Sequence, residues 1–168
     1  RHRLPVEIGV QRVQRGAMNG LKVDVRVRGA GSPARGFKDI AALVKKSGFP
    51  STVRDRALEV FQALFKAEAK VHGRRLQDTH LHEAGADDAL VDVLGACHLL
   101  EVLDIQKVYA SPLNLGSGWV KTSHGVLPVP PPAVAELLRG IPVYSAWAEA
   151  ELVTPTGAAL VSVLAESF

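Results

Sequence analysis

Hydrophobic and polar residues alternate in the first part of the chain. Between residues 21 and 27, four aliphatic residues alternate with Lys22, Asp24 and Arg26. A period of two is typical of a strand with one buried face. A second strand is predicted over Glu7–Val13, and the Asn19-Gly20 pair between the two supplies turn chemistry. The two segments therefore predict a β-hairpin.

Three segments then follow the helical period. Helices are predicted over Phe37–Ser47, from a capping Ser51 to about His72, and from about Ala86 to Leu103. The inner stripe of the second helix is apolar except for one charged residue, Glu68. The third helix is apolar almost all round, so we expect it to be central and buried.

The last third of the chain mixes short strands with two more helices. Strands are predicted over Lys107–Leu115 and Trp119–Thr122, across a Gly116-Ser-Gly118 turn, with further strand pieces in Val143–Val153. One helix should begin at the prolines before Ala133, and the last should follow a cap at Thr154 or Thr156. This order predicts an α/β (mixed α+β) fold, with a mixed β-sheet flanked by helices in a single domain, 1–168.

The composition narrows the class of protein. The chain has 168 residues, of which 47% are hydrophobic and 22% charged, as in globular domains. The lone Cys97 excludes an internal disulfide and, without a signal peptide, predicts a cytoplasmic protein. The longest apolar stretch is too short and too polar for a membrane span, and the few aromatic residues offer no stacking platform for nucleic acid. Because the chain begins at Arg1 and not at a methionine, we expect a fragment of a longer protein that lacks its extreme N-terminus.

The charges are unevenly distributed. Residues 1–75 hold 17 Lys and Arg against 6 Asp and Glu, and residues 76–168 hold 3 against 11. The first part could attract an anionic ligand and the second a cation. The simpler interpretation, which we prefer, is two solvated faces that attract each other within the fold.

Candidate metal ligands cluster around the start of the third predicted helix. If residues 79–83 are extended, His80 and His82 point to one side, because the side-chain period of a strand is two. Asp88 and Asp92 lie one helical turn apart on one face. Imidazole and carboxylate donors suit Mg, Mn, Fe, Ni or Zn. Together with Glu83, these residues predict a divalent-metal site.

Less specific interpretations stay open beside the metal site. Asp88 could simply complement the dipole of its helix, as could His72 at the end of the preceding helix. His80 and His82 could be core residues with satisfied hydrogen bonds. A metal site would also suit a non-catalytic metal-binding or scaffold module, or a metal-dependent hydrolase.

A family resemblance adds to this pattern. The segment from His80 to Gly95, HLHEAGADDALVDVLG, resembles the His-x-His-Glu-x-Gly-Ala-x-Asp-x-x-x-Asp signature of the LarC-type nickel-insertion proteins. The resemblance extends from about Phe37 to the end of the chain. It includes the stretches Glu68–Gly73, Ser111–Gly118, His124–Pro130 and Glu151–Gly157.

The resemblance implies a function. Such proteins insert nickel into pyridinium-3,5-bisthiocarboxylic acid mononucleotide, a small-molecule substrate, in a CTP-dependent reaction that makes the nickel-pincer cofactor of lactate racemase. Family members continue into a C-terminal domain that this chain lacks, and the resemblance implies that CTP, with Mg or Mn, binds there. The sequence allows a homo-oligomer. Because nickel replaces a ring proton, a base is needed. The implied site residues are His80, His82, Asp88 and Asp92 for the metal, His82 and Glu83 for catalysis, and His124, Glu151, Thr154 and Thr156 for the substrate.

Overall fold

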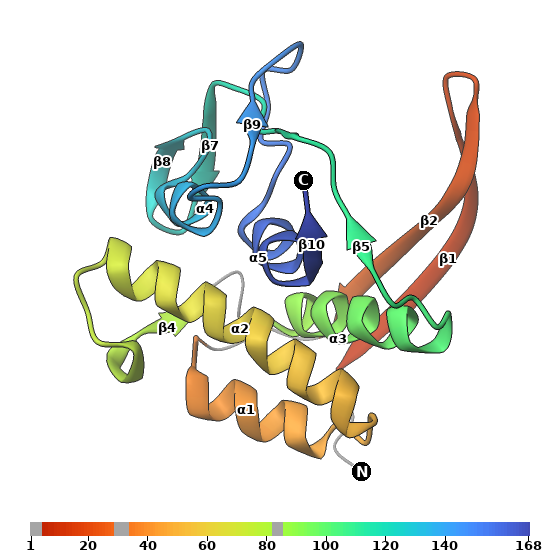
Figure 1. Cartoon of the computed structure of the whole chain (residues 1–168), viewed down its shortest axis with the longest axis vertical. Coiled ribbons are helices and arrows are strands. Elements are labelled where there is room, and N and C mark those ends of the chain that lie inside the picture. The colour runs from red at the N-terminus through yellow and green to blue at the C-terminus, as the bar shows by residue number, and fades with distance from the viewer. Residues whose placement is uncertain (1–4, 29–33, 82–85) are drawn as a thin grey trace.

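The computed structural model describes residues 5–28, 34–81 and 86–168 of the chain. A long β-hairpin comes first, three helices follow, and short strands with two further helices complete the chain (Figure 1). The mixed α/β class predicted from the sequence is confirmed. In place of one continuous mixed sheet, the described strands form five two-stranded sheets. Helix packing therefore supplies most of the core.

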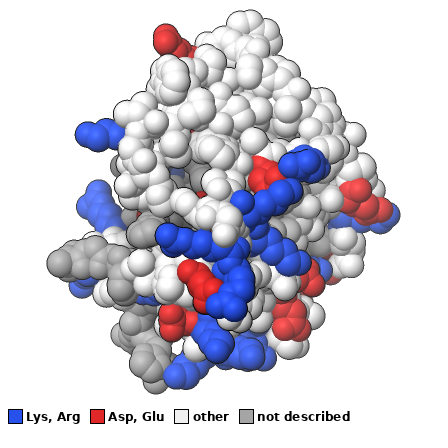
Figure 2. Space-filling view, turned by 90° about the vertical axis from the view of Figure 1, so that its left-hand side faces the viewer, with Lys and Arg blue, Asp and Glu red and all other residues white. Residues whose placement is uncertain are grey.

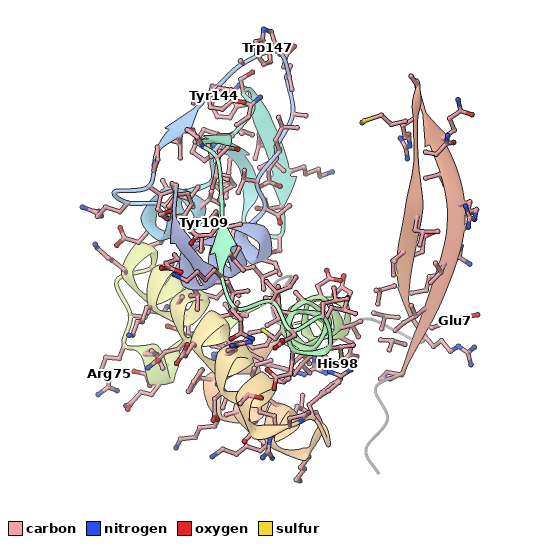
Figure 3. The ribbon with its side chains drawn as sticks, turned by 45° about the vertical axis from the view of Figure 1, so that its right-hand side comes forward. Glu7, Arg75, His98, Tyr109, Tyr144 and Trp147 are labelled. Carbon is pink, nitrogen blue, oxygen red and sulfur yellow. The ribbon has the colours of Figure 1, made fainter. Side chains whose placement is uncertain are left out.

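The predicted hairpin is present. Strand β1 (Val6–Arg15) pairs antiparallel with β2 (Met18–Val27), in register from Val6 opposite Val27 to Arg15 opposite Met18. The turn lies at Gly16, whose φ of 57° is favourable for glycine. The Asn19-Gly20 pair, which was predicted to supply the turn, lies inside β2 instead. Most of the hairpin projects away from the rest of the structure, and only its base approaches α3 (Asp87–Val102) (Figures 1 and 3).

The three predicted helices are confirmed within two residues at each end. They are α1 (Phe37–Lys46), α2 (Ser51–Val71) and α3. The predicted cap at Ser51 is wrong, because Pro50 occupies the cap position with an extended backbone and Ser51 is already helical. Helix α2 is the central element and packs against α1, α3, α4 (Pro132–Leu137) and α5 (Pro155–Leu164).

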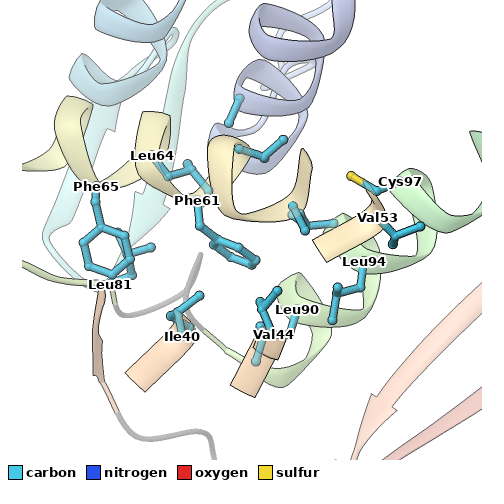
Figure 4. Packing of buried hydrophobic residues seen from close by; sticks show 14 residues of the cluster. Ile40, Val44, Val53, Phe61, Leu64, Phe65, Leu81, Leu90, Leu94 and Cys97 are labelled. Atoms are coloured by element: carbon cyan, nitrogen blue, oxygen red, sulfur yellow. The ribbon is translucent and has the colours of Figure 1, made fainter. Parts of the chain in front are cut away.

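The main core lies among α1, α2 and α3 (Figure 4). Phe61, Phe65, Ile40 and Leu90 are fully buried there. The expectation that α3 would be buried all round is wrong at its C-terminal end, where Leu99 and Val102 are 57% and 62% exposed.

Four further pairs of short strands hold the loops in place. Strand β3 (Arg35–Gly36) pairs with β4 (His80–Leu81), which follows the 3₁₀ turn η1 (Leu76–Asp78). The strand predicted over Lys107–Leu115 is two pieces. Of these, β5 (Val108–Tyr109) pairs with β10 (Ala165–Ser167), and β6 (Leu113–Asn114) pairs with β9 (Val143–Tyr144). Strand β7 (Trp119–Thr122) pairs with β8 (Gly125–Pro128), not across the turn at residues 116–118.

Ion pairs join the basic first part of the chain to the acidic second part. Lys70 on α2 contacts Glu136 on α4 at 2.5 Å, and Arg56 lies 3.6 Å from Glu101. On the face drawn in Figure 2, Lys and Arg side chains gather over the lower half with Asp and Glu side chains between them. The two parts therefore do attract each other within the fold. None of the helices in the described part of the chain is long and apolar enough to cross a membrane.

Candidate functional site

A pocket of about 440 Å³ opens where α2, α3, α4 and α5 meet the β7–β8 hairpin. It is lined by every predicted site residue that the structure describes, although these residues come from five separate segments. They are His80, Asp88, Asp92, His124, Glu151, Thr154 and Thr156. The remaining two, His82 and Glu83, lie outside the described residues. The pocket is therefore the candidate functional site.

His80 enters the pocket from strand β4. The short β3–β4 ladder places it opposite Gly36, whose amide donates a hydrogen bond to Asp39 Oδ2 at 3.0 Å. A Cβ atom at Gly36 would lie 3.8 Å from His80 Nε2, so the imidazole is close to the backbone of the neighbouring strand. The next residue, Leu81, is 2% exposed and fixes the strand to the core.

Asp88 and Asp92 face the pocket from the first two turns of α3. Asp88 Oδ1 accepts a hydrogen bond from the amide of Ala89 at 2.9 Å. Partial burial raises the pKa of Asp92, and the negative charge of Asp88 raises it further. Two neighbouring carboxylates that repel each other favour a bound cation, which would relieve the repulsion.

Among the residues that the structure describes, the predicted donors line the pocket without forming a closed cage. Within residues 5–28, 34–81 and 86–168, no three His, Cys, Asp or Glu side chains lie close enough together to hold a metal ion. A ligand that fills the pocket could still contact donors on several walls.

The pocket lining also contains a histidine pair, of which only His124 was predicted from the sequence as a site residue. The rings of His72 and His124 have centroids 5.0 Å apart and are tilted by 43°. His72 Nε2 also lies 3.4 Å from Glu68 Oε2, one helical turn earlier on α2. All three side chains line the pocket. The sequence marked this group only in part: His124 was predicted to bind the substrate, and Glu68 is the single charge in the inner stripe of its helix.

The C-terminal segment completes the pocket. Thr154 caps α5, as predicted, and its Oγ1 accepts a hydrogen bond from the amide of Gly157 at 3.2 Å. Glu151 is held by an antiparallel bridge to Gly116. On the β7–β8 hairpin, Thr122 Oγ1 accepts a hydrogen bond from the amide of His124 at 3.1 Å, and Lys121 adds a cationic side chain to the lining.

Comparison with known sequences assigns the chain to a family. The sequence model of nickel insertion proteins matches residues 2–168. The chain belongs to the nickel insertion protein family. No solved structure matches it significantly.

Individual relatives from this family are nearly half identical to the chain. A protein of Geotalea daltonii named "Putative nickel insertion protein" is 46% identical over 96% of this chain and 41% of its own length. One of a Synechococcus species with the same name is 49% identical over 95% of this chain and 41% of its own length. The pyridinium-3,5-bisthiocarboxylic acid mononucleotide nickel insertion protein of Desulfitobacterium hafniense is 44% identical over 96% of this chain and 40% of its own length. The chain thus spans about two fifths of the length of these relatives.

Proposed function

We propose that the pocket is the place where nickel is inserted into pyridinium-3,5-bisthiocarboxylic acid mononucleotide. The observation that carries the proposal is the convergence of seven predicted site residues on one pocket. The Desulfitobacterium hafniense relative is named for this reaction. The proposal extends that activity to the protein in which this chain occurs.

The name of the substrate defines the chemistry. Thiocarboxylates at ring positions 3 and 5 flank carbon 4, so a metal held by both sulfurs lies against that carbon. Forming a nickel–carbon bond there displaces the ring proton, which needs a base. Soft sulfur donors bind nickel firmly, so the substrate itself supplies most of the final ligands.

His80, His82, Asp88 and Asp92 are the proposed ligands for incoming nickel. Nickel is cargo in this reaction, so the protein must hold the ion loosely enough to release it. The open arrangement of His80, Asp88 and Asp92 around the pocket is compatible with that requirement. His82 and Glu83 are the candidates for the base that the family resemblance implies.

The other walls would hold the mononucleotide. Its phosphate is anionic, and the start of α5 with Thr154 and Thr156 has the electrostatic polarity that favours an anion. Glu151 and His124 would contact the ribose or the pyridinium ring. CTP with Mg or Mn is the proposed co-reactant, which drives the insertion from a site outside this pocket.

Metal titration tests the nickel site. Isothermal titration with nickel and with manganese should detect binding to the chain, weakened in both His80→Ala and Asp92→Ala. Asp78→Asn is the matched control, because Asp78 is exposed and does not line the pocket. Binding that survives both site variants would place the metal elsewhere.

Turnover tests the reaction. The complete protein in which this chain occurs should convert the mononucleotide to its nickel complex when nickel, CTP and Mg or Mn are supplied, as detected by mass spectrometry. Metal binding without turnover would favour a non-catalytic metal-binding module. Cleavage of phosphoesters on addition of Mn or Zn would favour a hydrolase.

A further inference from the structure

Neither member of the histidine pair is a proposed nickel ligand, and His72 has no role in the proposed function. His72 is the C-cap residue of α2, and His124 lies in the turn between β7 and β8, 52 positions later in the sequence. Their rings nevertheless pack at a centroid distance of 5.0 Å inside the same pocket as His80, Asp88 and Asp92.

The nickel ligands are poorly suited to take the ring proton. An imidazole nitrogen or a carboxylate oxygen that donates its lone pair to nickel cannot accept a proton with the same pair. The reaction therefore favours a base on the pocket lining that is separate from the ligand set. His72 meets this condition, because it lies on a different wall from the proposed ligands.

The surroundings of His72 suit a general base. A carboxylate 3.4 Å from Nε2 favours a proton on that nitrogen, which leaves Nδ1 as the basic atom. The ring of His124 contacts the same imidazole and restricts its orientation. The side chains of His72 and Glu68 are 35% and 19% exposed, so the pair is accessible from the pocket and partly shielded from water.

We propose that His72, positioned by Glu68 and His124, is the base that accepts the proton displaced from the pyridinium ring when nickel is inserted. In this step the bond between carbon 4 and its hydrogen breaks, and its electron pair forms the nickel–carbon bond. The proton goes to His72 Nδ1. The step therefore needs no external oxidant or reductant. This inference rests on the proposed function.

The test is single-turnover nickel insertion in the complete protein in which this chain occurs, with nickel, CTP, Mg and the mononucleotide. His72→Ala should slow insertion by about 100-fold or more, the usual contribution of a general base, while nickel and mononucleotide affinities stay close to those of the unmodified protein. Glu68→Gln should slow it by about 10-fold or more, as expected for the partner that orients a catalytic imidazole.

Two readouts separate base catalysis from a structural role. Free imidazole should restore part of the rate to His72→Ala and add nothing to the unmodified protein. Deuterium at ring carbon 4 should slow insertion more in the variant than in the unmodified protein. His72→Gln provides a second variant in case the smaller side chain disturbs the fold. His98→Asn is the control, because it removes an imidazole from α3 outside this pocket.

The outcomes are distinguishable. An unmodified protein that inserts nickel, together with His72 variants that insert it at the same rate, would overturn the base assignment alone. Loss of insertion in Glu83→Gln with normal rates in the His72 variants would give the role to Glu83. An unmodified protein that binds nickel and never inserts it would overturn the proposed function, and the base assignment with it.

Discussion

The guanidinium of Arg35 lies 2.7 Å from the carboxylate of Asp87, and the two side chains are only 13% and 5% exposed. Arg35 belongs to β3, which pairs with the strand that carries His80. Asp87 is the first residue of α3, which carries Asp88 and Asp92. This buried ion pair therefore fixes the imidazole wall of the pocket relative to the carboxylate wall.

Removing either partner of this pair should destabilise the protein and loosen the site. Asp87→Asn removes the negative charge from this buried ion pair, and breaking comparable pairs costs about 3–5 kcal/mol. We expect a lower free energy of unfolding in a urea titration, and weaker nickel binding at temperatures where the variant is still folded.

The exposed pair of Arg28 and Glu7 is the matched control, because its atoms are 3.1 Å apart and its side chains are 72% and 57% exposed. Glu7→Gln should cost less than about 1 kcal/mol. Equal urea midpoints for Asp87→Asn and Glu7→Gln would contradict the role of the buried pair.

The ionised carboxylate of Asp92 should lower the free energy of unfolding at neutral pH, and this unfavourable contribution should disappear at low pH, where the carboxyl is protonated. Its pKa in the folded protein is raised above the unfolded value by partial burial and by Asp88. The folded state therefore binds this proton more tightly, and stability falls as the pH rises through the titration of Asp92. Asp92→Asn should raise the free energy of unfolding at pH 7 by a few tenths of a kcal/mol, the usual size of a like-charge pair one turn apart.

The pH dependence provides the check on Asp92. Near pH 3 the carboxyl is protonated in both states, so thermal unfolding of Asp92→Asn and of the unmodified protein should coincide. In an Asp88→Asn background the gain at pH 7 should shrink, because the repelling charge is gone. A variant less stable than the parent at pH 7 would show that the Asp92 carboxylate has a stabilising partner.

Local sequence patterns predicted the helices and the hairpin because these elements are stabilised by neighbours in the chain. The apolar period of α1, α2 and α3 fixed their ends within two residues. The pairing of β6 with β9 joins Leu113 to Val143, 30 positions apart, and no local signal marks a parallel two-residue ladder. The same limit explains why one mixed sheet was expected.

The site shows the same division between local and distant relationships. The spacing of Asp88 and Asp92 predicted a shared helical face, and both do line the pocket. The pairing of Arg35 with Asp87 across 52 positions had no sequence signal. His72 was attributed to the dipole of its helix, because its contact with His124 exists only once the β7–β8 hairpin folds back over α2.

Thr154 should contribute both to stability and to the pocket. Its hydroxyl satisfies the amide of Gly157 at the start of α5, and losing such a cap costs about 1 kcal/mol. Thr154→Ala should therefore lower the thermal midpoint, whereas Thr154→Ser should preserve it, because serine retains the oxygen. If both variants unfold at the temperature of the parent, the hydroxyl does not stabilise the helix.

Gly116 should not tolerate any larger residue, because the backbone of a second segment of the chain passes directly against it. A Cβ atom at this position would lie 1.8 Å from the carbonyl oxygen of Ala150, and the φ angle is +77°. Gly116→Ala must therefore displace the segment that holds Glu151 in the pocket. Backbone strain alone costs about 1–3 kcal/mol, and the displacement should additionally weaken binding of the mononucleotide.

Gly140 separates these two effects. It has a similar φ of +81°, and nothing lies within 4 Å of a Cβ atom built there. Gly140→Ala should show the strain in its thermal midpoint and keep the mononucleotide affinity of the parent, because residue 140 does not line the pocket. Gly116→Ala should lose both stability and affinity in titration calorimetry. If the two variants bind the mononucleotide equally well, the bridge between Gly116 and Glu151 does not shape the binding site.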